Sequence, residues 1–339
     1  MSRPEMSRPE MSGDGRPTDS ERWKARHAME EMADEHESPV GRRYLTRMSS
    51  KGRGRRLQVI LGTGLVVLAV VASLSIFGVW PRVGAAILSR TGSTETKTTV
   101  LLDENFNANS LDTRVWNTCH WWGDEGCTIS SNDELEWYRP EQVSVSDGAL
   151  RLTADRISTR GSDGKEYEYR SGMVTTGPVD SDDDVGKVSW TYGTVDVRLR
   201  VPAGQGLWPA VWMLPLDHES RPEIDILEVI GQEPGRMLMH FHPTDREDDS
   251  PNKDYRLTGK DLAEDWHTVR LDWQPKRLTW FVDGKQVWHL TGSQVPDEPM
   301  YLVLNLAVGG VYPGPPDETT KFPATFEIDH VRITKNELQ

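Results

Sequence analysis

Three acidic residues, Glu223, Asp225 and Glu228, lie close together in the segment PEIDILE, which covers residues 222–228. Apolar residues separate them, and this alternation predicts a β-strand in which Glu223 and Asp225 point to the same face. Glu228 is out of phase by one residue, and a single β-bulge around 226–227 returns it to that face. The pattern therefore predicts three carboxylates on one face of one strand.

Crowded carboxylates of this kind can do acid–base chemistry. Proximity raises the pKa of at least one of them, so that it keeps a proton near neutral pH and can act as a general acid. Two carboxyl groups about 5–5.5 Å apart are also the arrangement of a retaining glycosidase, in which one is the nucleophile and the other the acid/base. An acidic strand that only faces solvent is the alternative, since E-x-D-x-x-E by itself is a weak pattern.

Tryptophan and histidine side chains flank the acidic segment. Trp208 and Trp212 lie upstream in GQGLWPAVWMLP, and His240 follows twelve residues after Glu228. Exposed tryptophan rings form flat apolar platforms for the C–H faces of sugars, whereas a tryptophan of a β-sandwich more often belongs to the core. Together with the acids, these neighbours favour a carbohydrate substrate.

The acidic strand must belong to a larger β-structure. Residues from about 100 to 336 consist of short alternating or apolar runs between turn residues. No long segment among them shows the apolar periodicity of an amphipathic helix. In YGTVDVRLRV, Val195, Val197 and Leu199 share one face of a half-buried strand. SDG at 146–148 and VDGK at 282–285 predict hairpin turns. The predicted fold class is all-β, an antiparallel sandwich or jelly roll.

The order of several segments resembles glycoside hydrolase family 16, and within it the laminarinase-like, endo-1,3-β-glucanase branch. The resemblance covers nearly all of residues 100–336. It implies an antiparallel β-jelly-roll sandwich whose concave sheet forms an open glycan-binding cleft, and an enzyme that hydrolyses O-glycosyl bonds of a β-glucan. The matching segments are NDELEWYRPEQVSVSDGALRLTA, YRSGMVTT, YGTVDVRLRVPAGQGLWPAVWMLP, EIDILEVIG, WHTVRLDWQPKRLTWFVDG, YLVLNLAVGG and FPATFEIDHVRI.

The resemblance also implies a role for each candidate residue. Glu223 would be the nucleophile that forms a covalent glycosyl-enzyme, and Glu228 the acid/base that protonates the leaving oxygen and then activates water. Asp225 would hydrogen-bond the nucleophile and tune both carboxyl groups, with His240 beside the acid/base. The implied substrate-binding residues are Trp208, Trp212, His240 and Asn132, the last on the non-reducing side.

A structural calcium ion on the convex side is a further implication of the resemblance. Its ligands would be the carbonyl of Gly148, Asp329 and a first-strand carbonyl near Asn105. Oxygen ligands suit calcium. No organic cofactor is expected.

Three features of the segments concern the contacts with the substrate and its linkage. Asp133 stands where the laminarinase-like pattern has a second asparagine, whereas NLAVGG and the spacing E-x-D-x-x-E favour β-1,3 linkages. The acidic tract SDDDVG at 181–186 is either a loop at the rim of the cleft or solvated surface.

One alternative function is a transglycosylase or a depolymerase of the cell's own exopolysaccharide. Another is a non-catalytic glycan-binding jelly roll, although such a module does not need three carboxylates.

Charge excludes one class of partner. The 339 residues include 39 Lys plus Arg and 53 Asp plus Glu, a net charge of −14, and the excess of acid lies entirely after residue 81. A domain this negative repels polyphosphate, so nucleic acid is not an expected partner. A neutral β-glucan is compatible with this charge, and we expect the protein to act as a monomer.

Residues 57–81 contain no charged side chain and predict a transmembrane signal anchor that binds the lipid bilayer. As a helix, LQVILGTGLVVLAVVASLSIFGVWP would span about 37 Å, enough for a hydrocarbon core of about 30 Å. Residues 42–56 contain seven Lys or Arg and no acid. The positive-inside rule therefore places the N-terminus in the cytoplasm and the catalytic domain outside the cell. A signal peptide cleaved at the small residues 84–86 is the alternative.

The segments around the anchor are polar. Residues 1–56 repeat MSRPE and predict a disordered cytoplasmic tail. Residues 82–99 predict a linker, followed by the catalytic domain at 100–336. Cys119 and Cys127 then lie outside the membrane, where an oxidising environment favours a local disulfide bond; a pair of unpaired thiols is the alternative.

Overall fold

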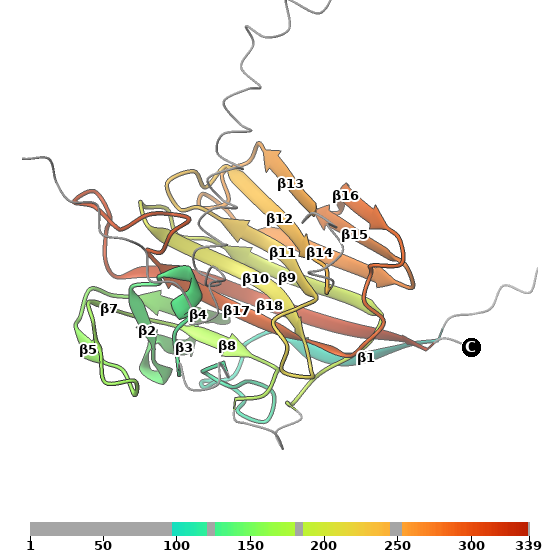
Figure 1. Ribbon diagram of the computed structural model, residues 1–339, viewed down its shortest axis with the longest axis horizontal. Coiled ribbons are helices and arrows are strands. Elements are labelled where there is room, and N and C mark those ends of the chain that lie inside the picture. Colours follow the sequence, from blue (N-terminus) through green and yellow to red (C-terminus); the bar gives the residue numbers. More distant parts are fainter. Residues whose placement is uncertain (1–96, 121–125, 180–185, 245–252, 338–339) are drawn as a thin grey trace, which may run out of the picture. The chain divides into compact units, whose positions relative to one another are not determined.

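Two antiparallel β-sheets pack face to face in a computed structural model that describes residues 97–120, 126–179, 186–244 and 253–337 (Figure 1). Within these ranges the helical segments are two short 3-10 helices, η3 (Ser130–Asn132) and η4 (Pro140–Gln142). The all-β sandwich predicted from the strand pattern is confirmed.

The larger sheet has eight strands, and its order brings the last long strand beside the first. Strand β1 (Lys97–Glu104) pairs with β18 outside the main path. Along that path the strands are β16 (Lys285–Thr291), β15 (Arg277–Val282), β14 (His267–Gln274), β9 (Gly193–Arg200), β18 (Ala324–Glu337), β4 (Ala149–Ala154) and β3 (Val143–Ser146).

The second sheet has six strands and carries the acidic segment at its centre. In spatial order they are β13 (Lys253–Thr258), β12 (Arg236–His242), β11 (Glu223–Val229), β10 (Leu207–Pro215), β17 (Met300–Val308) and β8 (Met173–Thr175). Two small sheets accompany it: β2 (Glu136–Tyr138) pairs in parallel with β7 (Tyr169–Ser171), and β5 (Thr159–Arg160) pairs with β6 (Glu166–Tyr167).

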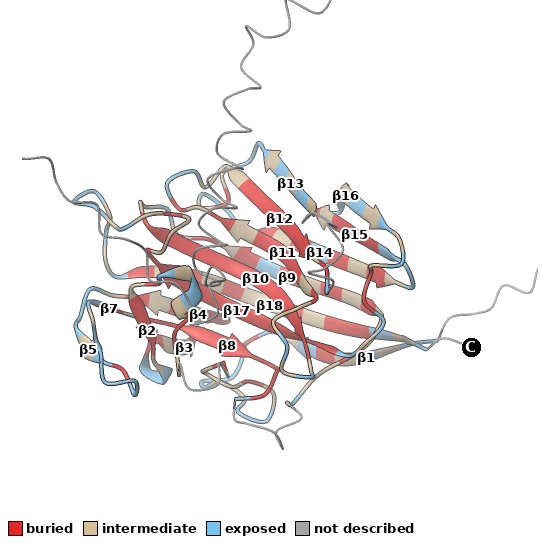
Figure 2. Cartoon of the chain, in the orientation of Figure 1, coloured by how far each residue is buried: buried red, intermediate tan, exposed pale blue. Residues whose placement is uncertain are grey.

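The hydrophobic core lies between the two large sheets, and strand alternation decides which side chains enter it. In β9 the predicted inward set, Val195, Val197 and Leu199, is buried in this core. Strand β17 is buried along its whole length, as the red ribbon in Figure 2 shows. Its other face contributes to a second cluster on the outer face of the six-stranded sheet. This outer cluster consists of Ile129, Tyr138, Met173, Ala210, Trp212, Leu214, Tyr301 and Val303.

Both predicted hairpin turns are present. Asp147 and Gly148 connect β3 to β4 with φ values of 52° and 72°, and Asp283 and Gly284 connect β15 to β16 with 48° and 75°. Two consecutive positive φ angles match the right-handed twist of the flanking strands, which is why an aspartate–glycine pair is favoured there.

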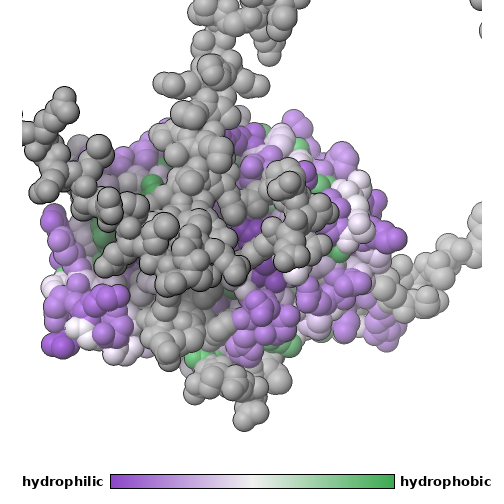
Figure 3. All heavy atoms as spheres, viewed as in Figure 1, coloured by the Kyte–Doolittle hydropathy of each residue, from purple (hydrophilic) through white to green (hydrophobic). Residues whose placement is uncertain are grey.

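Hydrophilic side chains dominate the visible surface of the described residues (Figure 3). The exposed large hydrophobic residues among them, Val100, Ile157 and Val179, are far apart in the sequence. An extended apolar patch, such as those that mark protein–protein interfaces, is therefore not evident in this part of the chain.

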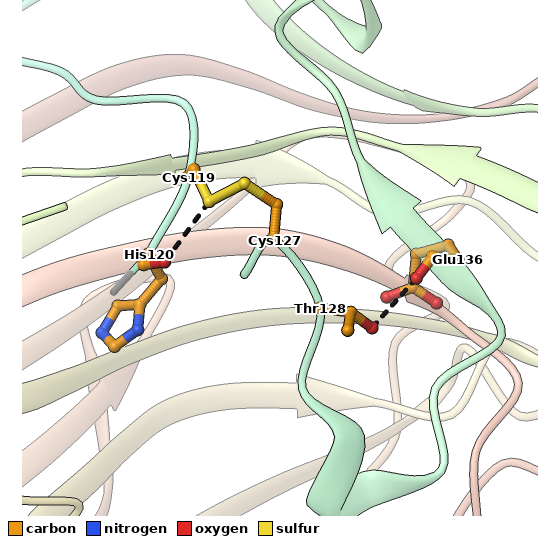
Figure 4. The surroundings of a disulfide bond; sticks show 5 residues. All are labelled: Cys119, His120, Cys127, Thr128 and Glu136. Carbon is orange, nitrogen blue, oxygen red and sulfur yellow. Dashed lines mark hydrogen bonds between the residues drawn. A yellow bond between two sulfur atoms is a disulfide. The ribbon is translucent and has the colours of Figure 1, made fainter. Parts of the chain in front are cut away.

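A disulfide bond joins Cys119 to Cys127, as predicted (Figure 4). It closes the segment that leads into η3 and β2, and it lies beside His120. His120 is buried: its Nε2 is 2.5 Å from the Tyr301 hydroxyl, and its ring stacks on Trp212 at 6.1 Å between centroids. Cys127 packs against the outer cluster, so the disulfide bond connects Cys119 to that cluster.

The predicted tail at 1–56, the anchor at 57–81 and most of the 82–99 linker lie outside the described residues. Strand β1 begins at Lys97, so the last three residues assigned to the linker are part of a strand. Among the described residues no helix has the length and apolar character needed to cross a bilayer.

Candidate active site

A β-bulge in β11 brings the three acids together. Asp225 lies opposite His240 of β12 and Glu228 opposite Leu238, so two residues of β11 stand against a single residue of β12. The pairing of β11 with β10 shifts at the same place. Residues 226–227 both enter the core, and Glu228 therefore shares the outer face with the other two acids. The predicted bulge is confirmed.

The core supports the backbone at this bulge. Trp280 of β15 is fully buried between the sheets, and its indole Nε1 donates a hydrogen bond to the backbone carbonyl of Asp225 at 3.0 Å. A buried carbonyl without a partner would be costly. This bond therefore connects the packing of the larger sheet to the position of the acids.

Glu228 has a partner on each carboxylate oxygen. Trp208 of β10 donates from Nε1 to Oε1 at 2.9 Å, and Nε2 of His240 forms an ion pair with Oε2 at 3.2 Å. The other ring nitrogen of His240 donates to Asp254 of β13 at 2.8 Å. Strands β10 to β13 thus contribute one continuous chain of contacts: Trp208, Glu228, His240, Asp254.

The charges on this chain follow from burial and pairing. Burial raises the pKa of Glu228 to about 7, and the positive charge of His240 limits the rise. For His240, burial favours the neutral ring, but attraction to Glu228 and the hydrogen bond to Asp254 outweigh it and raise the pKa to about 10. At neutral pH His240 is therefore an imidazolium. The carboxyl group of Glu228 beside it gains and loses its proton near pH 7.

Glu223 and Asp225 form the second half of the site. Burial raises the pKa of Glu223 to about 8, and repulsion from Asp225 adds to the effect. Burial also raises the pKa of Asp225 to about 7, opposed by His240 and by a hydrogen bond with Glu223. Nε2 of His242 lies 3.3 Å from Oδ2 of Asp225, and the rings of His240 and His242 stack in parallel at 5.8 Å. Two histidines thus face three acids.

This arrangement supports two kinds of chemistry. Acids with pKa values near neutrality can donate and accept protons, as general acid–base catalysis requires. Ligand atoms of Glu223, Asp225 and His242 also lie within 4.8 Å of one another, so these residues could hold a metal ion. The identity of such an ion does not follow from this donor set, because carboxylate and imidazole ligands suit several divalent metals.

The two predicted tryptophans lie in different surroundings. Trp208 bonds the acid/base candidate and meets Tyr312 edge-on at 5.6 Å between ring centroids. Trp212 belongs to the outer cluster and donates from Nε1 to Oδ1 of Asn305 at 2.8 Å. Trp208 and Trp212 are only 7 % and 6 % exposed, so of the two alternatives that the sequence leaves open, an open platform and a core residue, neither ring is an open platform. What each presents to a ligand is limited to an edge or a small part of a face.

Asn132 lies in η3, apart from the acidic triad. Its side chain donates to Oε1 of Glu134 at 2.9 Å, and its carbonyl accepts the N–H of Val311. It is thereby held beside the loop that follows β17.

Sequence reasoning missed several residues that contact the candidate site. His242 could have been found, because in the HFH segment it shares a strand face with His240. Asp254 and Asn305 could not, because only strand pairing brings them to His240 and Trp212. Glu134, Glu136 and Tyr138 were noticed only as part of a family motif, with no role for their buried polar groups.

Strand pairing places the three residues predicted to bind calcium along β18, where its partner changes from β4 to β1. Ile328 pairs with Leu150, two residues after Gly148, and Val331 pairs with Glu104, next to Asn105. Asp329 forms an ion pair with Arg198 through one oxygen. Its other oxygen, Oδ1, is buried and has no hydrogen-bond partner among the described residues. A buried carboxylate oxygen without a hydrogen-bond donor is an atom that an oxygen-liganded cation could neutralise.

Comparison with known proteins places this geometry in context. The family model described as Glycosyl hydrolases family 16 matches residues 131–332. The chain is 33 % identical over 266 residues to glucan endo-1,3-beta-glucosidase A1 of Niallia circulans. That match covers 70 % of this chain and 38 % of the relative.

Two further proteins extend the comparison. Endo-1,3-1,4-beta-glycanase EglC of Rhizobium meliloti is 30 % identical over 249 residues, which covers 69 % of this chain and 51 % of the relative. The matched region is thus about half or less of the length of these two relatives. The X-ray structure of endo-beta-1,3-glucanase from Pyrococcus furiosus superposes with a TM-score of 0.63 at 29 % identity, over 72 % of this chain and 97 % of that one.

Proposed function

Because the chain belongs to the glycosyl hydrolases of family 16, we propose that its β-sandwich is an endo-acting, retaining β-glucanase whose main substrate is β-1,3-linked glucan. The observation that carries the proposal is the bulge of β11, which places Glu228 on the same face as Glu223 and Asp225 and against His240. In an acidic strand that only faces solvent, the carboxyl groups would remain hydrated and would not be packed against histidines.

Each side chain has a step in a double displacement. Glu223, ionised at the moment of attack, forms the covalent glycosyl-enzyme, and a protonated Asp225 donates a hydrogen bond to it. Glu228, protonated, gives its proton to the leaving oxygen and then takes one from water. The fixed positive charge of His240 stabilises the carboxylate that Glu228 becomes after donation. In the same proposal Trp208, Trp212 and Asn132 contact the sugar chain.

The linkage is the finer part of this proposal. The relative from Niallia circulans is named for 1,3 linkages and EglC for 1,3-1,4 linkages, so a mixed-linkage glucan is the second candidate substrate. NLAVGG and the bulged spacing of the acids favour 1,3. Hydrolysis of laminarin and of lichenan by the purified protein, compared at equal sugar concentration, separates these candidates.

One experiment tests the reaction itself. The anomer first released from laminarin is followed by proton NMR before mutarotation. We expect the β-anomer, since two inversions at the anomeric carbon give net retention. An α-anomer would remove Glu223 from the role of nucleophile, and absence of any turnover would favour the non-catalytic glycan-binding alternative.

We also propose a structural calcium ion held by Asp329 and the carbonyls of Gly148 and Asn105. When bound, the ion would neutralise the buried Oδ1 of Asp329 and tie β18 to the turn between β3 and β4. Ligand bound only to the folded state stabilises it by mass action. Chelation should therefore lower the melting temperature without abolishing activity in the cold; an unchanged melting curve would contradict the site.

For location, we propose that residues 57–81 anchor the enzyme in the membrane with the β-sandwich outside. The support is the charge-free stretch and the basic segment before it. Fractionation and external protease digestion of whole cells test this. A mature protein that begins near residue 86 and is free of the membrane would contradict it.

A further inference from the structure

A second group of buried acids lies beside the outer cluster. Glu134 precedes β2 and Glu136 is its first residue; both are buried, and they lie close enough for the negative charge of one to raise the pKa of the other, while Oε1 of Glu136 has no hydrogen-bond donor among the described residues. Oε2 of Glu136 also accepts the backbone N–H of Val308 at 2.8 Å. Among the described residues, none of the hydrogen-bond partners of this pair is a lysine, arginine or histidine. The pair is therefore not neutralised in the way that the catalytic acids are.

The hydrogen bonds decide which acid is ionised. Two carboxyl groups that share a buried site do not both ionise, so one of them keeps a proton. Glu134 accepts further bonds on both oxygens: from Asn132 at 2.9 Å, and from the backbone of Ile129 and the hydroxyl of Tyr138 at 3.4 and 3.1 Å. Burial raises the pKa of Glu134 as well, but these three donors stabilise its ionised form and oppose the rise, whereas Glu136 accepts the backbone N–H of Val308 and has an Oε1 without a donor in the described part of the chain. We therefore assign the proton to Glu136. Burial and the negative charge of Glu134 raise the pKa of Glu136 well above its usual range.

The network continues in one direction to Trp212. An indole N–H can only donate, so Asn305 must present Oδ1 to Trp212 and Nδ2 to the hydroxyl of Tyr138, at 2.8 and 3.0 Å. The Tyr138 hydroxyl, having accepted from Asn305, donates to Glu134. Every bond from Trp212 onward therefore points toward one acceptor, the carboxylate of Glu134.

Two predicted sugar contacts thus depend on the same charge. Asn132 reaches Glu134 directly, and Trp212 reaches it through Asn305 and Tyr138. Trp212 also pairs with Asp225 across β10 and β11, so the network ends one strand away from the catalytic acids. His120, a further titratable residue, stacks on the Trp212 ring and contacts Tyr301.

We propose that Glu134, kept as a carboxylate by the proton on Glu136, is a positioning residue that orients Asn132 and Trp212 for binding of the glucan chain. The inference rests on the proposed function, because it assumes that these two side chains contact sugar. It assigns Glu134 to substrate binding and not to bond cleavage.

The test compares amide variants at the two acids. Glu134→Gln replaces an oxygen acceptor with an N–H₂ donor, which must oppose Asn132 or Tyr138. We expect the KM for laminarin oligosaccharides to rise about tenfold with kcat changed less than about threefold, since losing a hydrogen bond to a charged group has that order of effect. Glu136→Gln retains a donor toward Glu134 and an acceptor for Val308, so this conservative variant should rescue most of the affinity that Glu136→Leu loses.

A second measurement does not depend on catalysis. The indole N–H resonance of Trp212, assigned with Trp212→Phe, should shift in Glu134→Gln and in Tyr138→Phe, while that of Trp208 stays in place. Glu141→Gln is the matched control, because Glu141 is an exposed acid of the same segment. If the protein does not hydrolyse glucan at all, the resonance still reports on the network, so the two proposals fail separately.

The outcomes that overturn the proposal are specific. A folded Glu134→Gln protein with KM within twofold of wild type, or an unmoved Trp212 resonance, would show that Glu134 only fills space. An equal rise in KM in Glu134→Gln and Glu136→Gln would show that the proton is not on Glu136. If Glu134→Gln fails to fold, Tyr138→Phe supplies the same test one bond further along.

Discussion

Two groups of acids are stabilised in different ways: a largely buried group on β11 of the six-stranded sheet, and a buried pair at the start of β2 in the small sheet beside it. Glu223, Asp225 and Glu228 face His240 and His242, so their charges meet cations. Glu134 and Glu136 meet neutral donors and each other. Burying an unpaired charge is costly, and a protein can reduce that cost either by pairing the charge or by keeping a proton on it. The first arrangement leaves protons free to move, whereas the second fixes them.

This difference suggests a division of labour. Acids that titrate near neutral pH next to an imidazolium are suited to proton transfer. Acids that share one proton in a buried network are suited to holding other side chains still. Four predictions test this division of labour.

The largest effect is expected for Glu223→Ala, which removes the proposed nucleophile. Without it no glycosyl-enzyme can form, so kcat on laminarin should fall by about 10⁴-fold or more. Azide should restore turnover of an α-glycosyl fluoride and give the β-glycosyl azide. Activity within tenfold of wild type, in a folded variant, would place the chemistry elsewhere.

A smaller effect is expected for His240→Asn, which removes the cation beside the acid/base. Glu228 must be protonated to donate, so activity falls as the pH rises through its pKa of about 7. The charge of His240 holds that pKa down, and its loss should move the alkaline limb of the kcat/KM profile to higher pH, with kcat lower by about tenfold. Asp254→Asn should shift the limb in the same direction but less. A limb that does not move would separate His240 from Glu228.

A change in stability of a few degrees is expected for Glu136→Gln, and its sign depends on pH. Glu136 has a raised folded-state pKa, so above the unfolded value near 4.5 the wild type loses stability because its unfolded chain ionises while the folded state keeps the proton. Glutamine has no such proton. The melting temperature of Glu136→Gln relative to wild type should therefore rise from pH 5 to pH 8. A difference that is constant with pH would mean that Glu136 is ionised in the fold.

The smallest effect is expected on the solvent face of the larger sheet. Asp196 pairs with Arg270 at 2.6 Å, but the arginine is largely exposed. Exposed ion pairs contribute little, so Asp196→Asn should lower the free energy of unfolding by about 0.5 kcal/mol in urea titrations and leave KM unchanged. A loss of several kcal/mol would mean that an acid–cation pair matters for folding irrespective of burial, and the contrast between the two buried groups would lose its basis.

The sequence by itself determined much of the local structure. Period-two alternation identified the strands, aspartate–glycine pairs identified the turns of β3–β4 and β15–β16, and the phase of Glu228 identified the bulge. These features depend on a residue and its near neighbours, because side-chain alternation and turn geometry are set within a few bonds. The disulfide between Cys119 and Cys127 was predictable for the same reason, since the two cysteines are only eight positions apart.

Only the tertiary structure decided which side chains surround those acids. Asp254 reaches His240 because β13 pairs with β12, and Asn305 reaches Trp212 because β17 pairs with β10, across 93 residues of chain. The sequence also left open whether the tryptophans are platforms or core, and packing by His120 and the outer cluster buried Trp212. Strand order and loop packing are set by the summed burial of both sheets, a property of the whole chain that no local pattern contains.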